Sequence, residues 1–375
     1  MNVCEFWVKS DSNRTTSYTQ FLHTVVVVKA LGGGSLHRMS RVQFIHSYDT
    51  IISLENLLVA WSEFKNGKKK RKDVQEFELN LMANIISLHN DLATKTYRHS
   101  SYEAFNISDP KPRSIHKAKV RDRLLHHAIY QKLYPFFNRM FIADSYSCRF
   151  GKGTHKAIKR FDLFSRKASQ NHTKTLWVLK CDIRKFFASV DQPTLIKIVK
   201  EYIPDSDIVN LISEVVGSFH SVEKGVGLPL GNLTSQLLVN IYMNKFDQFT
   251  KHQLKVKYYI RYADDFVIFE TDKDKLLEMR PKIAVFLENE LKLSLHPKKV
   301  SISTIASGVD YLGWVHFPDH RVLRTVTKKR MFRGIQTKEG KEDTVQSYLG
   351  LLSHGNTRKL QTKVRETVRG IIKLK

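Results

Sequence analysis

The sequence is poor in cysteine and has no long apolar run. Its 375 residues include three cysteines, Cys4, Cys148 and Cys181, without a Cys-x-x-Cys pair. Neither a disulfide framework nor a thiolate zinc site is therefore predicted, and a reducing, cytoplasmic location is expected. The longest apolar runs, such as TVVVV at 24–28, are much shorter than a membrane-spanning helix. The start of the chain, with Glu5 and no continuous apolar core, does not fit a signal peptide either.

Acidic residues are scarce relative to basic ones. The chain has 36 Asp and Glu against 62 Lys and Arg, which gives a formal charge of +26. Such a charge predicts a polyanionic partner; nucleic acid is the first candidate, and a membrane surface is the competing one. Because 42% of the residues are hydrophobic, the chain can bury a sizeable core. We expect a globular protein that folds as one multi-lobed unit or as two to three subdomains.

The first quarter of the chain divides into an irregular start and a helical stretch. Residues 1–45 show no sustained periodicity, and we interpret them as an N-terminal extension, disordered or a mis-assigned start. From 46 to 97 the pattern is helical, and apolar side chains recur at three- and four-residue steps at Phe77, Leu81, Ile85 and Leu88. The basic cluster KNGKKKRK at 65–72 is either a solvated loop or a phosphate contact.

The next segments predict a hairpin followed by two helices. Residues 98–120 contain two short strand patterns joined at Asp109-Pro110, a turn-forming pair. A helix, RLLHHAIYQKLYPFFNRMF, follows. The stretch SYSCRFGKGTHKAIKRF then predicts a glycine-broken basic loop that enters a helix.

A strand pattern at 175–191, TLWVLKCDIRKFFASVD, carries the first candidate functional acid. Period-two alternation puts Leu176, Val178, Lys180 and Asp182 on one face, with Asp182 at the end of the strand, where a site can open. Asp191, before Gln-Pro, has the pattern of a helix cap. Cys181 is most simply a small buried hydrophobe.

Two adjacent acids, Asp264 and Asp265, lie inside the apolar run YYIRYADDFVIFE. Asp is disfavoured in strands and a buried unpaired carboxylate is costly, so the pair indicates a surface hairpin turn or a cation site. If Asp182 comes from a neighbouring strand, three carboxylates converge, an oxygen-rich set that suits Mg²⁺. Two ions about 4 Å apart can activate a 3′-hydroxyl and stabilise departing pyrophosphate. Because successive strand residues face opposite ways, we expect Asp264 to bridge both ions and Asp265 to support them.

Five segments occur in the order and spacing of the palm motifs of reverse transcriptases. They are LKCDIRKFFASVD, GLPLGNLTSQ, YIRYADDFVIF, LSLHPKKVSIS and YLGWVHF. The match spans roughly 98–317, and the helical segment from 46 resembles the N-terminal extension of bacterial, intron-related members. The resemblance implies a right-hand α+β polymerase fold: helices and fingers over 46–175, a palm with an antiparallel sheet over 176–317, and a basic helical thumb over 318–375.

Within that family, GLPLGNLTSQ and SYLGLLSHGN at 347–356 look most like diversity-generating retroelement reverse transcriptases. Intron-type members usually carry Gln before the motif glycine and end the motif in Ser-Pro, where this chain has Leu230 and Ser235-Gln236. The implied activity is RNA-directed DNA synthesis that copies a template RNA with errors at adenines. The alternatives are a phage-defence or other stand-alone reverse transcriptase and a catalytically idle RNA-binding protein of the same fold.

The resemblance also implies cofactors and partners. Two Mg²⁺ ions, with Mn²⁺ as a substitute, are expected at Asp182, Ile183, Asp264 and Asp265. The implied partners are template RNA, the cDNA, dNTPs and a small basic accessory protein, without a membrane. The last 55 residues, from Arg321, hold 15 Lys or Arg against four acids, which fits a thumb that follows the phosphates of a duplex.

The resemblance assigns further residues to the substrates. Phe187 stands at the place of the steric gate that excludes ribose, with a core aromatic as the alternative, while Leu230, Gly231 and Gln236 are expected at the incoming nucleotide. Gly231 would let the backbone approach the nucleotide.

Three basic residues complete the expected site. Lys111 and Arg113 are candidates for gripping the triphosphate, although a solvated turn fits Lys111 almost as well. Lys299 resembles the lysine that protonates pyrophosphate, and Lys298 is its competitor. Tyr311 to Trp314 resemble the primer grip, with ordinary core as the alternative for Trp314.

Overall fold

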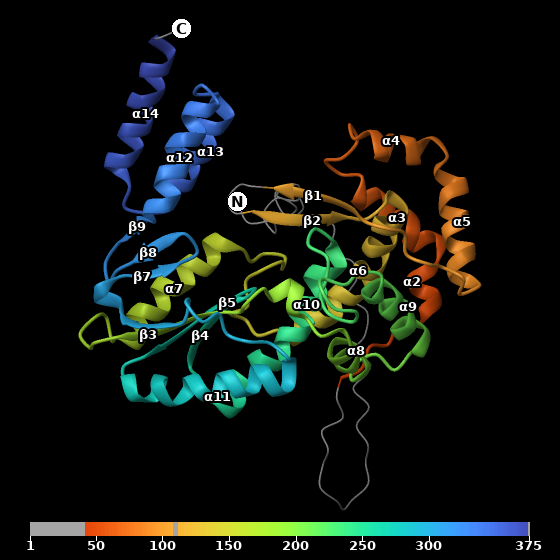
Figure 1. Cartoon of the computed structure of the whole chain (residues 1–375), viewed down its shortest axis with the longest axis horizontal. Helices are drawn as coiled ribbons and strands as arrows, with labels where there is room; N and C mark the ends of the chain where they lie inside the picture. Colours follow the sequence, from red (N-terminus) through yellow and green to blue (C-terminus); the bar gives the residue numbers. More distant parts are fainter. Residues whose placement is uncertain (1–41, 108–111, 374–375) are drawn as a thin grey trace, which may run out of the picture. The chain divides into compact units, whose positions relative to one another are not determined.

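The computed structural model describes residues 42–107 and 112–373. Most of the predicted extension 1–45, and Lys111, lie outside these described residues. The chain forms two compact units, each made from two stretches of sequence (Figure 1). The first unit comprises the chain up to Phe141 together with Lys185–Lys245, and the second comprises Ile142–Arg184 and Phe246–Lys375. The predicted boundaries at 45, 175 and 317 follow functional parts rather than these units, and they stay a prediction.

Within the described residues, the first unit contains helices and an antiparallel hairpin. Its helices are α2 (Tyr48–Ile52), α3 (Leu54–Phe64), α4 (Lys72–Leu79), α5 (Leu81–Ala93), α6 (Val120–Met140), α8 (Gln192–Lys200), α9 (Ser206–Gly217) and most of α10 (Leu233–Gln248), with the 3₁₀ turn η2 (Phe186–Ser189). The hairpin pairs β1 (Glu103–Ile107) with β2 (Arg113–Lys117), as predicted. The helical prediction for 46–97 is confirmed for most of this stretch, with breaks at Ser53, at 65–71 and at Asn80 (φ −119°, ψ 41°), which ends α4 and precedes α5.

The helix cap predicted at Asp191 is present. The backbone N–H of Thr194 donates to Oδ1 of Asp191 (2.8 Å), and Pro193 lies in the first turn of α8. A proline fits there because the first turn has no intrahelical use for its missing N–H. The structural interpretation of Asp191 is therefore confirmed.

The second unit is built on a four-stranded antiparallel sheet with the order β4-β5-β3-β6. The strands are β3 (Trp177–Asp182), β4 (Tyr258–Tyr262), β5 (Asp265–Glu270) and β6 (Ser301–Thr304). In Figure 1, α7 (Thr154–Ala168) and α11 (Lys273–Leu291) lie on opposite sides of this sheet, and both contact β5. Strand β5 is thus covered on both faces, which explains why its sequence is a continuous apolar run instead of an alternating one.

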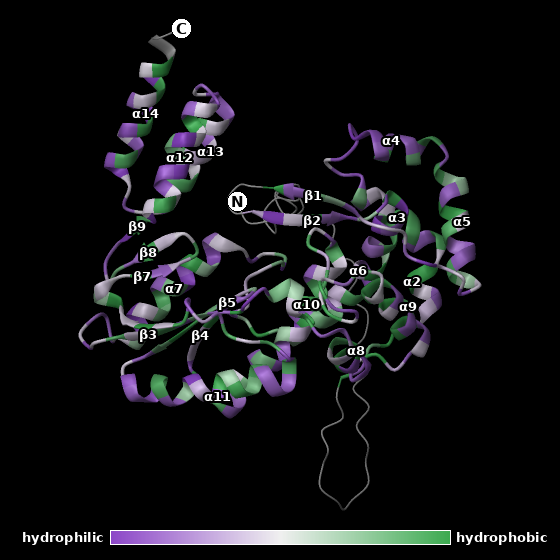
Figure 2. Ribbon diagram, viewed as in Figure 1, coloured by the Kyte–Doolittle hydropathy of each residue, from purple (hydrophilic) through white to green (hydrophobic). Residues whose placement is uncertain are grey.

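A smaller sheet and three further helices complete the described part of the second unit. The sheet order is β7-β8-β9, from β7 (Val309–Tyr311), β8 (Trp314–His316) and β9 (Arg321–Leu323), and the helices are α12 (Thr325–Thr337), α13 (Glu342–Leu352) and α14 (Arg358–Lys373). In the chain, the π turn η3 (Phe249–Gln253) precedes β4, and the 3₁₀ turn η4 (Ile305–Ser307) lies between β6 and β7. Figure 2 shows hydrophilic and hydrophobic residues alternating along α12 and α14, as in helices with one buried face.

Trp314 lies at the centre of the core under these helices. It is 1% exposed and packs in one cluster with Leu323, Met331, Ile335 and Val364. The core interpretation of Trp314 is therefore confirmed. Within the described residues, no helix is long and apolar enough to cross a bilayer.

Candidate active site

The strand register brings two of the predicted acids together. Strands β3 and β5 are neighbours, and Asp182, the last residue of β3, is paired with Asp265, the first residue of β5. Directly opposed residues of antiparallel strands carry their side chains on the same face. The two carboxyl groups therefore share one face at the end of the sheet, as expected if Asp182 came from a neighbouring strand.

Asp264 lies in a turn and not in a strand. Tyr262 pairs with Asp265, so Ala263 and Asp264 alone connect β4 to β5, and Ala263 adopts a left-handed conformation (φ 54°). The expectation that Asp264 and Asp265 are successive strand residues is wrong, because β4 ends at Tyr262 and Asp264 belongs to the turn that precedes β5. The hairpin-turn interpretation was correct in geometry, and it does not exclude a cation site. The backbone N–H of Ile183 donates to the carbonyl of Asp264 (3.2 Å), which ties this turn to the residue after Asp182.

The acids affect one another electrostatically. The pKa of Asp265 is raised from its ordinary value to about 7 by burial, then by the negative charge of Asp264 and less by that of Asp182, although Lys180 and Lys299 act in the opposite direction. A bound cation would relieve this repulsion, and carboxylate oxygens are the ligands that hard divalent ions prefer. Among the residues that the structure describes, no three His, Cys, Asp or Glu side chains form a ready-made metal cluster. The donor chemistry thus fits a divalent ion, while the side chains do not surround a common point.

The structure distinguishes between the two candidate lysines. Lys299 Nζ lies 2.9 Å from Oδ1 and 3.1 Å from Oδ2 of Asp182. Lys298 is exposed, and its backbone N–H donates to the ring of His296. The backbone N–H of His296 in turn donates to the carbonyl of Asp182 (2.7 Å), so this segment is attached to the end of β3. Lys299, and not Lys298, therefore contacts the carboxylate.

Two of the predicted nucleotide-site residues, Leu230 and Gly231, lie in a loop that contacts the hairpin of the first unit. The N–H of His116 donates to the carbonyl of Leu230 (3.0 Å), and the side-chain amide of Asn232 donates to the carbonyl of His116 (3.2 Å). Gly231 has φ 108°, and a Cβ atom there would lie 2.9 Å from Cγ2 of Ile115. The missing side chain of Gly231 thus makes room for β2, and its role toward a nucleotide stays a prediction.

Phe187 is only partly buried. It lies in η2, where its carbonyl accepts a hydrogen bond from the N–H of Leu228 (2.8 Å). The adjacent ring of Phe186 is 3% exposed and packs edge-on against Phe187, with the ring centroids 5.6 Å apart. The core position in this segment therefore belongs to Phe186.

The other predicted site residues differ in exposure. Gln236 in the first turn of α10 and Ile183 after β3 are buried, while Arg113 and Leu230 are half-buried. Leu230, Gln236, Arg113 and Phe187 belong to the first unit, whereas the acids and Lys299 belong to the second.

Two polar residues were missed by the sequence interpretation. Asn232, described above, is 2% exposed, and Arg261 in β4 is 1% exposed. The signal for Arg261 was present, because a charged residue inside the apolar strand YYIRY requires a buried partner.

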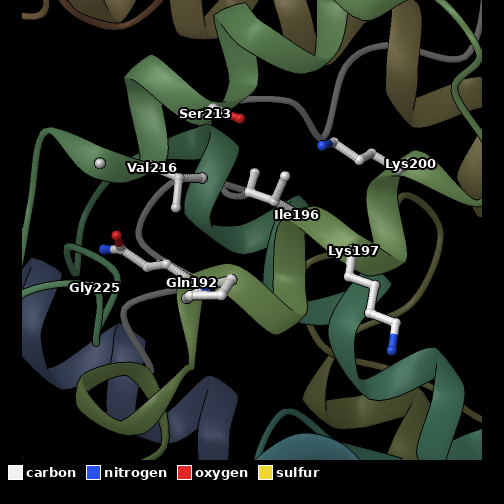
Figure 3. A pocket seen from close by; sticks show the side chains of 9 residues that line it. Gln192, Ile196, Lys197, Lys200, Ser213, Val216 and Gly225 are labelled. Atoms are coloured by element: carbon white, nitrogen blue, oxygen red, sulfur yellow. The ribbon is translucent and has the colours of Figure 1, made fainter.

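The first unit also contains a cavity of about 540 Å³ between α8 and α9 (Figure 3). Its lining consists of Gln192, Pro193, Ile196, Lys197, Lys200, Ser213, Val216, Gly217 and Gly225. The side-chain amide of Gln192 donates to the carbonyls of Phe219 (2.6 Å) and Gly227 (2.9 Å), so its N–H groups stabilise the surrounding backbone. None of the predicted catalytic or substrate residues lines this cavity, and we do not assign the chemistry to it.

Comparison with known proteins identifies the family of the chain. Residues 108–316 match the family described as reverse transcriptase (RNA-dependent DNA polymerase), over more than half of the chain. The chain belongs to this family and is an RNA-directed DNA polymerase by that membership. Its helices and antiparallel sheets are consistent with the predicted right-hand polymerase fold.

Several curated proteins are similar to the chain. Protein YkfC of Escherichia coli is 27% identical over 269 residues, which cover 61% of this chain and 68% of YkfC. The group II intron-encoded protein LtrA of Lactococcus lactis is 23% identical over 279 residues, 56% of this chain and 44% of LtrA. The putative COX1/OXI3 intron 1 protein of Saccharomyces cerevisiae is 24% identical over 183 residues, 47% of this chain and 21% of that protein. The relatives thus include intron-type proteins, and the narrower retroelement assignment stays a prediction.

Proposed function

We propose that the chain copies an RNA template into DNA by metal-dependent phosphoryl transfer, with Asp182, Asp264 and Asp265 as the metal ligands. The observation that supports this most directly is the register of β3 and β5, which puts Asp182 and Asp265 on one face. The hydrogen bond from Ile183 to the carbonyl of Asp264 adds the third acid to the same end of the sheet.

Mg²⁺ is the proposed cofactor, and Mn²⁺ is its substitute, because the candidate ligands are hard oxygen donors. The residues that would hold the ions are the three acids and Ile183. When bound, two such ions would activate the primer 3′-hydroxyl and stabilise the departing pyrophosphate. The contribution of the chain is to hold carboxylates close together in a partly buried place, where burial and then their repulsion raise the pKa of Asp265 and favour a cation.

Lys299 is the proposed proton donor to pyrophosphate. Its ammonium group lies at Asp182 and its side chain is 42% exposed, so Lys299 is both next to this acid and accessible to solvent. A protonated amine at this place can neutralise charge on a leaving group.

The substrate roles are proposed from the same resemblance. Phe187, with its partly exposed ring, would exclude the ribose 2′-hydroxyl, and Leu230, Gly231 and Gln236 would contact the incoming dNTP. Lys111, which is outside the described residues, and Arg113 would bind the triphosphate.

The helices α12 and α14 are proposed to bind the template–primer duplex. Exposed basic residues lie along both, at Lys328, Lys329, Arg333, Arg358, Lys359, Lys363, Arg365 and Arg369. Such side chains neutralise phosphates without reading sequence, so affinity for RNA should fall steeply as the salt concentration rises.

Primer extension on an RNA template with Mg²⁺ tests the proposal. We expect Asp264→Ala and Asp182→Ala to abolish DNA synthesis while RNA binding and its salt dependence persist. The matched control is Asp191→Ala, which also removes a carboxylate but only loses a helix cap, worth about 0.5–2 kcal/mol of stability, and should retain synthesis. Extension by Asp264→Ala or Asp182→Ala at the wild-type rate would reject the site, and an inactive wild type would favour an RNA-binding protein without catalysis.

We further propose that this synthesis is error-prone copying in a diversity-generating retroelement, with a small basic accessory protein as partner. The observation that favours this use is the GLPLGNLTSQ segment, in which Leu230 is a half-buried aliphatic residue before the loop glycine. The test is to sequence cDNA made by the wild type: an accurate product at template adenines would contradict this use and favour a phage-defence or other stand-alone enzyme.

A further inference from the structure

Arg261 of β4 forms a fully buried ion pair with Asp247. Its Nε and Nη2 atoms donate to the two carboxylate oxygens of Asp247 at 2.7 and 2.6 Å, and the hydroxyl of Tyr259 donates to the same carboxylate (2.8 Å). The exposed fractions of Arg261 and Asp247 are 1% and 0%. Both charges are therefore removed from water and matched by a two-point contact.

The same guanidinium also contacts the turn that contains Asp264. Nη1 of Arg261 donates to the carbonyl of Ala263 (3.2 Å), and Nη2 donates to the hydroxyl of Ser145 (3.1 Å). Ala263 directly precedes Asp264 and has φ 54°, a conformation that a residue with a side chain adopts only at a cost. A contact to its carbonyl can hold the turn in this conformation.

The backbone of Arg261 is fixed as well. Its N–H donates to the carbonyl of Asp144 (3.0 Å), and its carbonyl accepts from the N–H of Tyr146 (2.9 Å). Asp144 is itself held by Nε of Arg160 from α7 (2.7 Å) and by the hydroxyl of Tyr146 (3.1 Å). The guanidinium therefore contacts the turn from an anchored strand.

We propose that Arg261 is a positioning residue that sets the conformation of the Ala263–Asp264 turn and thereby presents Asp264 and Asp265 to divalent cations. This rests on the proposed function of the two acids. In this role Arg261 acts on the two acids through its hydrogen bond to the carbonyl of Ala263.

Stability alone does not account for this ion pair. Well-packed apolar residues of similar volume often replace a buried ion pair without loss of stability. An apolar pair cannot, however, donate a hydrogen bond to Ala263. The hydrogen bond to Ala263 is therefore the reason for a guanidinium at this position. A lysine cannot replace the arginine, because one ammonium group cannot reach Asp247, Ser145 and Ala263 together.

The first test compares Arg261→Lys with Tyr259→Phe. Tyr259→Phe removes a hydrogen bond to the same buried carboxylate but leaves the contact to Ala263, so it is the matched control. The readout is Mn²⁺ binding, measured by electron paramagnetic resonance with a primer that lacks the 3′-hydroxyl and the matching dNTP. We expect Arg261→Lys to weaken Mn²⁺ binding by about 10–100-fold, the usual effect of losing a residue that orients metal ligands. Tyr259→Phe should stay within about twofold of the wild type in Mn²⁺ affinity and kcat.

A second variant separates positioning from folding. The combination Tyr259→Phe, Asp247→Leu and Arg261→Met replaces the whole buried polar group by apolar side chains, and it is expected to unfold at a urea concentration close to that of the wild type. It should nevertheless bind Mn²⁺ as weakly as Arg261→Lys. Wild-type Mn²⁺ affinity in this folded variant, or in Arg261→Lys, would overturn the inference.

The variant Asp264→Ala shows whether a negative result concerns the role of Arg261 or the proposed function itself. If Asp264→Ala binds Mn²⁺ and extends primers normally, the metal-site assignment itself is wrong. If Asp264→Ala is inactive while the triple variant binds Mn²⁺ normally, only the role of Arg261 is wrong.

Discussion

Gly231→Ala is expected to destabilise the first unit and to loosen β2 from the loop before α10. Gly231 has φ 108°, and a Cβ atom at this position would lie 2.9 Å from Cγ2 of Ile115, a side chain that is 8% exposed. The neighbouring residue Leu230 accepts the hydrogen bond that attaches His116 to the loop. A methyl group at Gly231 must therefore push against β2 next to its point of attachment.

The magnitude has two parts. A positive φ costs a residue with a side chain about 1–2 kcal/mol. Overpacking in a close-packed interior adds about 1–3 kcal/mol. The free energy of unfolding should therefore fall by about 2–5 kcal/mol.

The assay is urea denaturation together with amide hydrogen exchange of the peptide that contains His116, whose protection should fall. Gly225→Ala is the matched control, because Gly225 also has a positive φ (81°) but a Cβ atom there would meet no atom within 4 Å. In this control the free energy of unfolding should fall only by the cost of the positive φ, about 1–2 kcal/mol.

A double-mutant cycle with Ile115→Ala isolates the contact. Ile115→Ala alone should lower the free energy of unfolding by about 2–5 kcal/mol. It also removes the Cγ2 atom against which the new methyl group of Gly231→Ala would pack. The double variant should therefore lose less stability than the sum of the single variants. Additive losses, or equal losses for Gly231→Ala and Gly225→Ala, would refute the argument.

Phe187→Val should raise the ratio of rNTP to dNTP incorporation, because a smaller side chain would meet the 2′-hydroxyl; Phe186→Val, at the buried ring, should lower stability without changing that ratio. Leu230→Gln should lower misincorporation opposite template adenine several-fold, about 1 kcal/mol, because it adds a polar contact, and identical error spectra by cDNA sequencing would rule out a role for Leu230. Burial, and then the charges of His99, His127 and Arg123, lower the pKa of His126 well below its ordinary value. The unfolded chain therefore binds the extra proton first, so the free energy of unfolding should fall as the pH decreases through about 6.5, by up to about 1.4 kcal/mol per pH unit. Urea titrations at about pH 7.5 and 5.5 measure this decrease in the free energy of unfolding, which should be smaller in His126→Gln than in the wild type. An equal decrease in the two proteins would show that His126 is not its source.

The sequence by itself determined the elements and their local signals. Alternation placed Asp182 at the end of a strand, and Asp191 before Gln-Pro indicated a helix cap that is present. The two strands on either side of Asp109-Pro110 were predicted from the sequence, and they pair as expected. These features depend on a few neighbouring residues, whose conformational preferences act within one turn of helix or one strand, so they can be read from short segments.

The tertiary structure alone decided which residues meet. The register between β3 and β5 put Asp265, and not Asp264, opposite Asp182, and the attachment of 294–296 to β3 brought Lys299 rather than Lys298 to the acid. The pairing of Arg261 with Asp247 joins residues 14 positions apart. A shift of one residue in a strand or loop would bring a different residue opposite each partner, while the conformational preferences of the short segment would hardly change. Only the packing of the whole unit therefore selects the observed pairs.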